Sequence, residues 1–549
     1  MTITESRPDE ERAVEPAAEP AVPMLTPPPP LPGVAGVVST SDHTVVGRLY
    51  MAVSLVFLIG ASVLWALAGF EGMDLDGFDV LEADVWTQVV TLAEVGLFMF
   101  GVWPLLIGLA LYVVPLQLGS PSAAFPRLAA ASFWGWLVGA GIVIAGYIAD
   151  GGPNGDDVDA VLLTLSGLGL VILSLLAATV SAVTTVLAVR PAGMSLRRVP
   201  AFSWSVLTAG SLWLLTFPVL AGNLLLIYLD ADHGQELYGA KGNIWAQVDW
   251  VFSQPAVFVF LVPVLGIVAD IVQSSARVPQ ALHRPVLAVI GVTAALSFGA
   301  WAQTAFNAAL VERATWIAMS VAIALPLLAL GGLLADNLRR GRPSVGSPLL
   351  LGLLAYVAAL AAGVCAALGA IDPLNLVGTT WADGLAKLIA AAAVLGAIAG
   401  LQYWGARIWG RTPPEGLMLL AALALVAGAA AFAVPELIAG GLGQVPLDLF
   451  GAAEVVEDGY EALNGVMAAG AVLIAVGVLV TILAIVPAAM RGARQPAEAR
   501  WKGLTLEWAE VGVPGAAGTR VPVAEVRSAT PLADEPDPST NDAATGEQN

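Results

Sequence analysis

The sequence is poor in charged residues, in cysteine and in histidine, and each scarcity narrows what the protein can be. Only 12% of its 549 residues are charged, whereas 58% are apolar, a composition typical of an integral membrane protein. The single cysteine, Cys365, excludes an intrachain disulfide and argues against a metal site built from thiolates. The three histidines, His43, His233 and His283, all lie outside the long apolar runs.

The apolar residues gather in twelve runs, each long enough to cross a bilayer at about 1.5 Å per helical residue. We therefore predict an all-α integral membrane protein with twelve transmembrane helices. Residues 1–40 are predicted to be a disordered, acidic, proline-rich tail, residues 41–490 the membrane domain, and residues 491–549 a cytoplasmic extension that is disordered at its end. The runs lie near 49–71, 86–116, 130–148, 158–189, 203–229, 245–274, 285–310, 314–335, 348–371, 380–408, 416–438 and 461–487.

The basic residues are distributed asymmetrically along this topology. If the N-terminus is cytoplasmic, nearly all arginines fall on the cytoplasmic side, the outside keeps only Lys241 and Arg313, and Lys387 sits within a span. This bias orients membrane proteins, so we predict a multi-pass plasma-membrane protein with both termini in the cytoplasm. The net charge of −20 resides largely in acidic outer connections, which we interpret as solubilising loops.

Several distinctive motifs follow one another along the predicted spans. The sixth run contains WVFSQPAVF at 250–258, which puts the polar Gln254 and the following proline in mid-membrane, where both need a reason. The other motifs are SDHTVVGRLY at 41–50, VPLQLGSPSAAFPRL at 114–128, PAGMSLRRVPAFSWSV at 191–206, a glycine and Tyr-Trp pair near 400–404, and TLEW at 505–508.

Together these motifs, over residues 41–534, resemble subunit I of the haem–copper oxidases, the cytochrome c oxidase family. The resemblance implies a twelve-helix bundle of that type, with six histidines that bind two haems and a copper ion. In this sequence the haem-ligand positions hold Ala93, Gly384 and Ala386. The copper-ligand positions hold Gln254, Gln303 and Thr304, for which we favour a role as hydrogen-bonded interior polar groups.

The family's proton-transfer residues are replaced as well. The resemblance places a proton-delivering glutamate at Ala256, a cross-linked tyrosine at Phe258 and a channel lysine at Leu330. At the channel entrance, Ser122 replaces an aspartate and Ala129 an asparagine.

These replacements predict a protein without haem or copper, and a non-catalytic scaffold or accessory subunit of the respiratory oxidase superfamily. The first alternative is an active terminal oxidase, which the family implies, with electron transfer from cytochrome c to oxygen and proton pumping. The second is a secondary transporter, although the paired broken segments of such proteins are not found here. The expected partners are the lipid bilayer and other respiratory oxidase subunits, and no nucleic acid.

Two charged residues within the spans require partners. Glu94 and Lys387 each follow a replaced low-spin haem ligand, Ala93 and Ala386, by one position. A charge deep in a bilayer is costly unless it is paired. We therefore predict an ion pair between Glu94 and Lys387 across the second and tenth spans.

Overall fold

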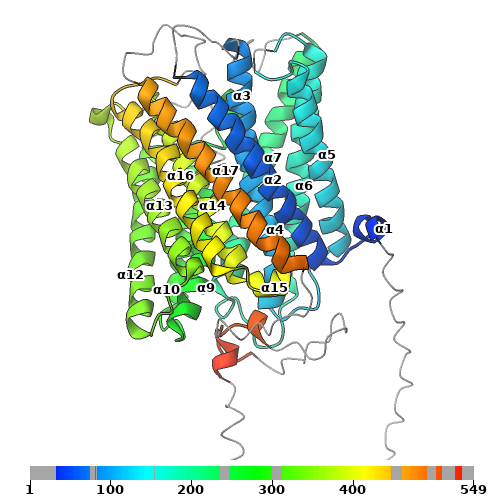
Figure 1. The fold of residues 1–549 in the computed structure, drawn as a ribbon, viewed down its shortest axis with the longest axis vertical. Helices are drawn as coiled ribbons and strands as arrows, with labels where there is room; N and C mark the ends of the chain where they lie inside the picture. The colour runs from blue at the N-terminus through cyan, green and yellow to red at the C-terminus, as the bar shows by residue number, and fades with distance from the viewer. Residues whose placement is uncertain are drawn as a thin grey trace, which may run out of the picture. The chain divides into compact units, whose positions relative to one another are not determined.

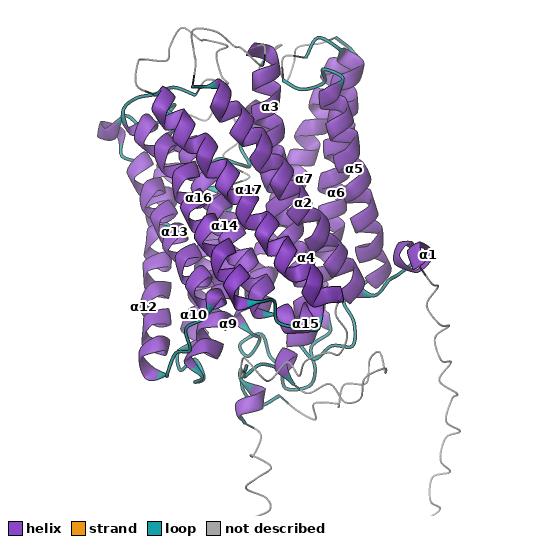
Figure 2. Cartoon of the chain, viewed as in Figure 1, coloured by secondary structure: helices purple, strands orange, loops and turns teal. Residues whose placement is uncertain are grey.

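The computed structural model describes residues 33–73, 81, 83–153, 155–234, 246–299, 301, 311–446, 460–490, 503–509 and 526–534. The chain divides into two units, Met1–Thr40 and Ser41–Asn549. In the first, the described residues include one short helix, α1 (Gly33–Val38). In the second, the described residues form helices and loops without a strand (Figure 2).

Long helices of the second unit run side by side as a bundle (Figure 1). In the part of the chain that is described, eleven helical segments are long and apolar enough to cross a membrane. The prediction of an all-helical membrane bundle is confirmed. The helices are α2 (His43–Glu71), α3 (Ala83–Val95), α4 (Trp103–Gln117), α5 (Pro126–Ile148), α6 (Val158–Ala188), α7 (Ala201–Asp232), α8 (Ala246–Asp249), α9 (Val262–Ala276), α10 (His283–Leu296), α11 (Val311–Ala322), α12 (Ala324–Arg340), α13 (Ser347–Gly369), α14 (Trp381–Tyr403), α15 (Gly405–Trp409), α16 (Glu415–Gly441) and α17 (Glu461–Met490).

The count differs from the predicted twelve in the seventh span, and the sixth span is shorter than its apolar run. The sixth run is not one helix: after α8 it passes through a 3₁₀ segment, Ala256–Phe260, before α9 begins. A proline cannot donate the backbone hydrogen bond of a helix interior, and Pro255 lies at this interruption. In the seventh run α10 has only 14 residues, and residues 302–310 lie outside the described part of the chain.

Local sequence explains where several helices begin. The Asp42 carboxylate accepts a hydrogen bond from Thr44 N at 2.8 Å and caps α2. Asp157 caps α6 in the same way. Prolines occupy the first turn of α4, α5 and α13, where a missing N–H costs nothing.

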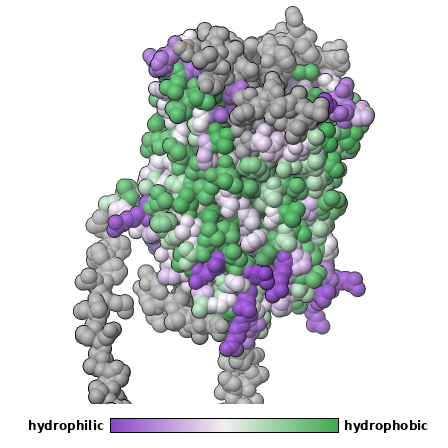
Figure 3. All heavy atoms as spheres, turned by 180° about the vertical axis from the view of Figure 1, so that it is seen from behind, coloured by the Kyte–Doolittle hydropathy of each residue, from purple (hydrophilic) through white to green (hydrophobic). Residues whose placement is uncertain are grey.

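Three segments form the centre of the bundle: Val85–Gln117, Ala256–Ala276 and Trp381–Tyr403, whose most apolar stretches are entirely buried. The surrounding helices are one-third to two-thirds buried, and their remaining apolar side chains face outward. On the face shown in Figure 3, apolar side chains cover the middle and polar side chains gather toward the two ends. This pattern is that of a protein whose belt faces lipid.

Candidate functional site

A cavity of about 90 Å³ lies among α2, α3, α14, α16 and α17, with room for several water molecules. These helices enclose it because α17 packs against both α2 and α16, and α16 packs against α14. Aromatic, charged and amide side chains all contribute to its wall. The polar and aromatic lining residues are Trp65, Trp86, Glu94, Phe98, Thr380, Asp383, Lys387, Glu436, Gln444, Tyr460 and Asn464.

A buried ion pair joins two walls of this cavity. The ammonium group of Lys387 on α14 donates to the carboxylate of Glu436 on α16, with side-chain exposures of 5% and 15%. The same Lys387 Nζ lies 3.8 Å from the centre of the Trp65 ring and 5.4 Å from that of Phe432. The carboxylate therefore neutralises the charge of Lys387, and the two aromatic rings stabilise it further.

Glu436 was not among the predicted site residues. The signal for it was available, because it is the one acidic residue within the apolar run 416–438, and an acid in mid-span needs a partner. Glu94 lines the same cavity as Lys387, as does Asp383. Glu94 and Lys387 therefore line one cavity, and an ion pair between the two stays a prediction.

The polypeptide next to Glu94 is a π-helix, η1 (Gly96–Val102), between α3 and α4. A π-helical turn contains an extra residue and rotates the side chains that precede it relative to those that follow, and it often occurs at functional sites. Leu97 and Phe98 of η1 contribute directly to the cavity wall. The irregular turn therefore belongs to the site.

The three haem-ligand positions of the resemblance lie on the central segments. Ala93 and Ala386 are buried, and Ala386 lines the cavity beside Lys387. At Gly384 a Cβ atom would lie 2.8 Å from Leu437 N, so α14 and α16 pack there backbone against backbone. None of these three side chains has a nitrogen, oxygen or sulfur donor, so they do not fit the histidine ligation of the family.

Of the three copper-ligand positions, only Gln254 falls in the described part of the chain; Gln303 and Thr304 lie outside it. Gln254 Nε2 donates to Ser320 Oγ at 3.2 Å. This contact agrees with an interior polar group whose amide has found a partner. Ala256 and Phe258, at the proton-delivery and tyrosine positions, are 3% and 1% exposed.

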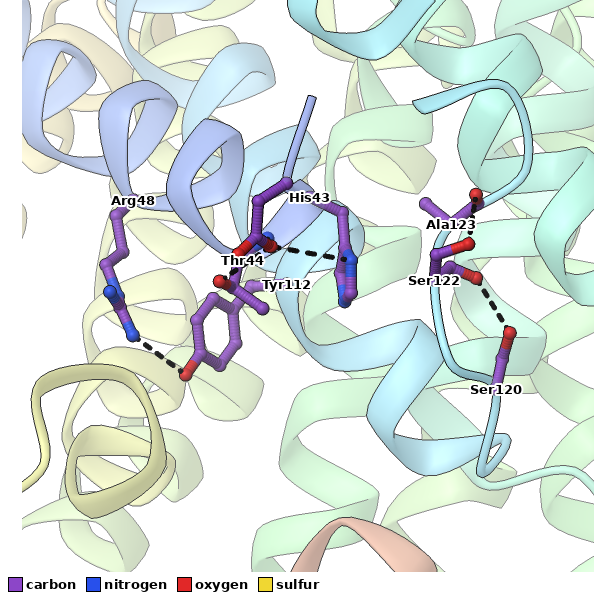
Figure 4. Close-up of polar contacts among 8 residues, drawn as sticks. His43, Thr44, Arg48, Tyr112, Ser120, Ser122 and Ala123 are labelled. Atoms are coloured by element: carbon purple, nitrogen blue, oxygen red, sulfur yellow. Dashed lines mark hydrogen bonds and ion pairs between the residues drawn. The ribbon is translucent and has the colours of Figure 1, made fainter. Parts of the chain in front are cut away.

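The channel-entrance positions are also free of titratable groups. Ser122 Oγ donates to the Ala123 carbonyl at 3.2 Å, and the Ser122 carbonyl accepts from Ser120 Oγ at 2.7 Å (Figure 4). These bonds satisfy the loop itself. Ala129 and Leu330 are fully buried.

A second polar cluster lies where the ends of α4, α7 and α14 meet the middle of α9, and the sequence analysis did not predict it. Gln117, Asp270 and Glu507 are buried, although Glu507 belongs to a short 3₁₀ helix, η7 (Leu506–Trp508), in the C-terminal segment. These residues are separated by more than 150 positions, so no spacing in the sequence connects them.

The arrangement agrees with comparisons to known proteins. A family model described as "Cytochrome C and Quinol oxidase polypeptide I" matches residues 45–473. The "Putative cytochrome c oxidase subunit 1-beta" of Streptomyces coelicolor is 27% identical over 503 residues, which cover 86% of this chain and 85% of the relative. The "Heme-copper oxidase subunit I+III" of Aeropyrum pernix is 30% identical over 403 residues, 69% of this chain and 49% of the relative.

The fold is also similar to that of a solved heme-copper terminal oxidase dimer. The TM-score is 0.54 with 12% identity, over 92% of this chain and 90% of that one. At this identity the likeness concerns the fold alone.

These comparisons correct one prediction. We predicted a chain without haem or copper, and the comparisons contradict this prediction, because the matched proteins are named as cytochrome c, quinol and heme-copper oxidases. The prediction rested on the six replaced histidine positions together with the replaced proton-transfer residues. Histidines at those six positions are one set of metal ligands, and other donor side chains of the bundle were outside the prediction.

Proposed function

Because the chain belongs to the cytochrome c and quinol oxidase polypeptide I family, we propose that it is a non-catalytic, subunit I-like component of a respiratory membrane complex. In this role the twelve-span scaffold holds partner subunits in the bilayer without itself reducing oxygen. We propose the absence of oxygen reduction, not the absence of the family's cofactors.

The observation that carries the proposal is the loss of titratable side chains at the positions of proton supply. Reduction of oxygen to water consumes protons, and a proton reaches a buried site by way of groups that can hold it. Here those positions hold Ala256, Leu330 and Ser122, of which the first two are buried hydrocarbon side chains. Replacement of the histidines at Ala93, Gly384 and Ala386 adds to this support.

The second candidate is a terminal oxidase, and the names of the relatives favour it. The Streptomyces and Aeropyrum proteins are named as oxidase subunits, and the match extends over most of this chain. An oxidase of this kind would need another route for protons. The cavity beside Lys387 and Glu436 is one place where the described residues offer titratable groups inside the bundle.

We further propose that the protein lies in the plasma membrane with both termini in the cytoplasm. The beginning of α2 and the end of α17 lie at the same end of the bundle (Figure 1). The C-terminal segment reaches that end too, because Arg198 Nη1 donates to the Val526 carbonyl at 3.0 Å and Arg407 Nη2 to the Ala509 carbonyl at 2.5 Å. Arginines that gather at one end support a cytoplasmic location for it.

Oxygen consumption by the purified chain tests the proposal. The chain is reconstituted in lipid nanodiscs and supplied with reduced cytochrome c or with a quinol. A catalytically active subunit I relative, reconstituted in the same way, is the positive control. We expect no consumption above the protein-free background, together with co-purification of other oxidase subunits identified by mass spectrometry. Turnover comparable to the control would establish the terminal oxidase instead.

A further inference from the structure

The C-terminal residues 503–509 insert into one end of the bundle. Leu506, Glu507 and Trp508 of η7 are 6%, 2% and 1% exposed, so a charged side chain is buried together with two large apolar ones. Trp508 Nε1 donates to Tyr403 Oη at 3.0 Å, which attaches the segment to the end of α14. Leu532 N in turn donates to the Leu504 carbonyl at 3.2 Å.

Gln117, at the end of α4, connects Glu507 to a second buried carboxyl group. Its Oε1 accepts from both Ser203 N at 3.2 Å and Ser203 Oγ at 2.7 Å. A backbone N–H can only donate, so this contact fixes which end of the amide is oxygen. Gln117 Nε2 therefore faces the acids, and it donates to Asp270 Oδ2 at 2.7 Å and to Glu507 Oε1 at 3.2 Å.

The two carboxyl groups differ in how well a negative charge on them is stabilised. Asp270 also accepts from Ala201 N at 3.1 Å and Phe202 N at 3.2 Å, the first backbone amides of α7. That helix has no side-chain cap of its own. Three N–H donors and the positive end of a 32-residue helix favour a charged Asp270.

At Glu507 the hydrogen bonds converge on one carboxyl oxygen, Oε1. Its Oε1 accepts the long bond from Gln117 and another from Trp404 Nε1 at 3.5 Å. Its Oε2 is buried and makes no hydrogen bond with the described residues, whereas the Thr505 hydroxyl and the Glu507 backbone N–H also stabilise a charge on the carboxyl group. Against these donors stands burial beside a second carboxyl group, which favours the neutral acid, and Oε2 is the oxygen left to carry its proton.

No cation neutralises the pair among the described residues. The ion pairs formed there involve other carboxylates. Among the described residues, titratable neighbours include Tyr403, whose hydroxyl contacts Trp508 and Ser274, and Arg407, whose guanidinium donates to the Ala509 carbonyl. Two buried carboxylates without a cation repel each other, and retention of one proton removes that repulsion.

We propose that Asp270 and Glu507, bridged by Gln117, form a proton-binding site, and that the proton held on Glu507 keeps the C-terminal segment docked against the bundle. Docking and proton binding are then linked. A proton that leaves Glu507 creates a second buried negative charge, and the segment is released into water, where the charge is solvated.

The sign of the pH dependence follows from this linkage. Burial raises the pKa of Glu507 above its ordinary value. A group whose pKa is higher in the docked form stabilises docking fully below its ordinary pKa of about 4.5 and loses that contribution as the pH rises toward the docked pKa. Within this window the docking equilibrium weakens by up to about tenfold per pH unit.

Hydrogen–deuterium exchange of the full-length protein in nanodiscs measures docking directly. The amides of residues 503–509 are followed between about pH 5 and pH 8, and their protection factors are corrected for the intrinsic pH dependence of exchange. We expect protection in the wild type to fall as the pH rises. Glu507→Gln keeps a neutral group of the same shape, so its protection should be high and independent of pH. Asp534→Asn removes an exposed acid further along the C-terminal region. It is the control and should retain the wild-type slope.

A second measurement locates the proton. In infrared difference spectra, the C=O band of a protonated carboxylic acid should be present in the wild type, be lost in Glu507→Gln and persist in Asp270→Asn. Three results would each overturn the proposal: pH-independent protection in the wild type, a slope retained in Glu507→Gln, or a carboxylic acid band that depends on Asp270 alone.

Discussion

Removal of one partner of the buried ion pair should be costly. In Lys387→Met the carboxylate of Glu436, 15% exposed, loses its ammonium partner within the cavity. Removing one partner of a buried ion pair costs about 3–5 kcal/mol. The substitution also removes the contact between the Lys387 ammonium group and the Trp65 ring. This loss adds little to the cost, because a methionine side chain also packs well on an aromatic face. We therefore expect the free energy of unfolding to fall by about 3–5 kcal/mol.

The size of the effect is tested by a double-mutant cycle. Unfolding by sodium dodecyl sulfate in mixed micelles, followed by circular dichroism, provides the free energies. Lys387→Met combined with Glu436→Leu removes both charges and should return to within about 1 kcal/mol of the wild type, because a buried ion pair is often replaceable by apolar side chains. The control is Arg340→Met, which removes an exposed i,i+4 pair with Asp336 and should cost only about 0.3–0.5 kcal/mol.

Two results would refute this reasoning. If Lys387→Met costs no more than Arg340→Met, the charge on Glu436 is solvated and the cavity is open to water. If the double variant is as unstable as Lys387→Met alone, the loss comes from packing and the charge pair contributes little.

Two further predictions concern the other end of the bundle and the topology. Gln117→Leu should destabilise the protein by about 3 kcal/mol, because it removes the donor shared by Asp270 and Glu507, and the same micelle unfolding measures it; a change below about 0.5 kcal/mol would show that the bridge is dispensable. Cysteines placed at Asp156 and Arg340, in a chain whose native cysteine is replaced by alanine, should react with a membrane-impermeant reagent from opposite sides, and labelling of both from one side would end the twelve-span topology.

The arrangement of the bundle follows closely from the apolar pattern. Helix α14 falls within the tenth predicted span and contains Gly384, Ala386 and Lys387. The interruption of the sixth span could be anticipated at Gln254 and the proline that follows it. Such local signals depend only on residues close in sequence.

The partners within the sites could not be predicted in the same way. Lys387 and Glu436 are 49 residues apart and meet only because α14 packs against α16. The π-helical turn η1 adds a residue to the second span, so the facing of Glu94 cannot be calculated from a regular 3.6-residue period. Glu507 lies in the TLEW motif of the C-terminal region, and no local spacing connects it with Asp270, beside which it is buried.

Oxygen consumption by the purified chain in nanodiscs is the measurement that tests the central claim most directly. The assay reads turnover whichever cofactors accompany the protein. With reduced cytochrome c or a quinol as the electron donor, we predict a rate equal to the protein-free background. A catalytically active subunit I in the same nanodiscs should consume oxygen rapidly. A rate for this chain that approaches that control would contradict the claim and make the protein a terminal oxidase.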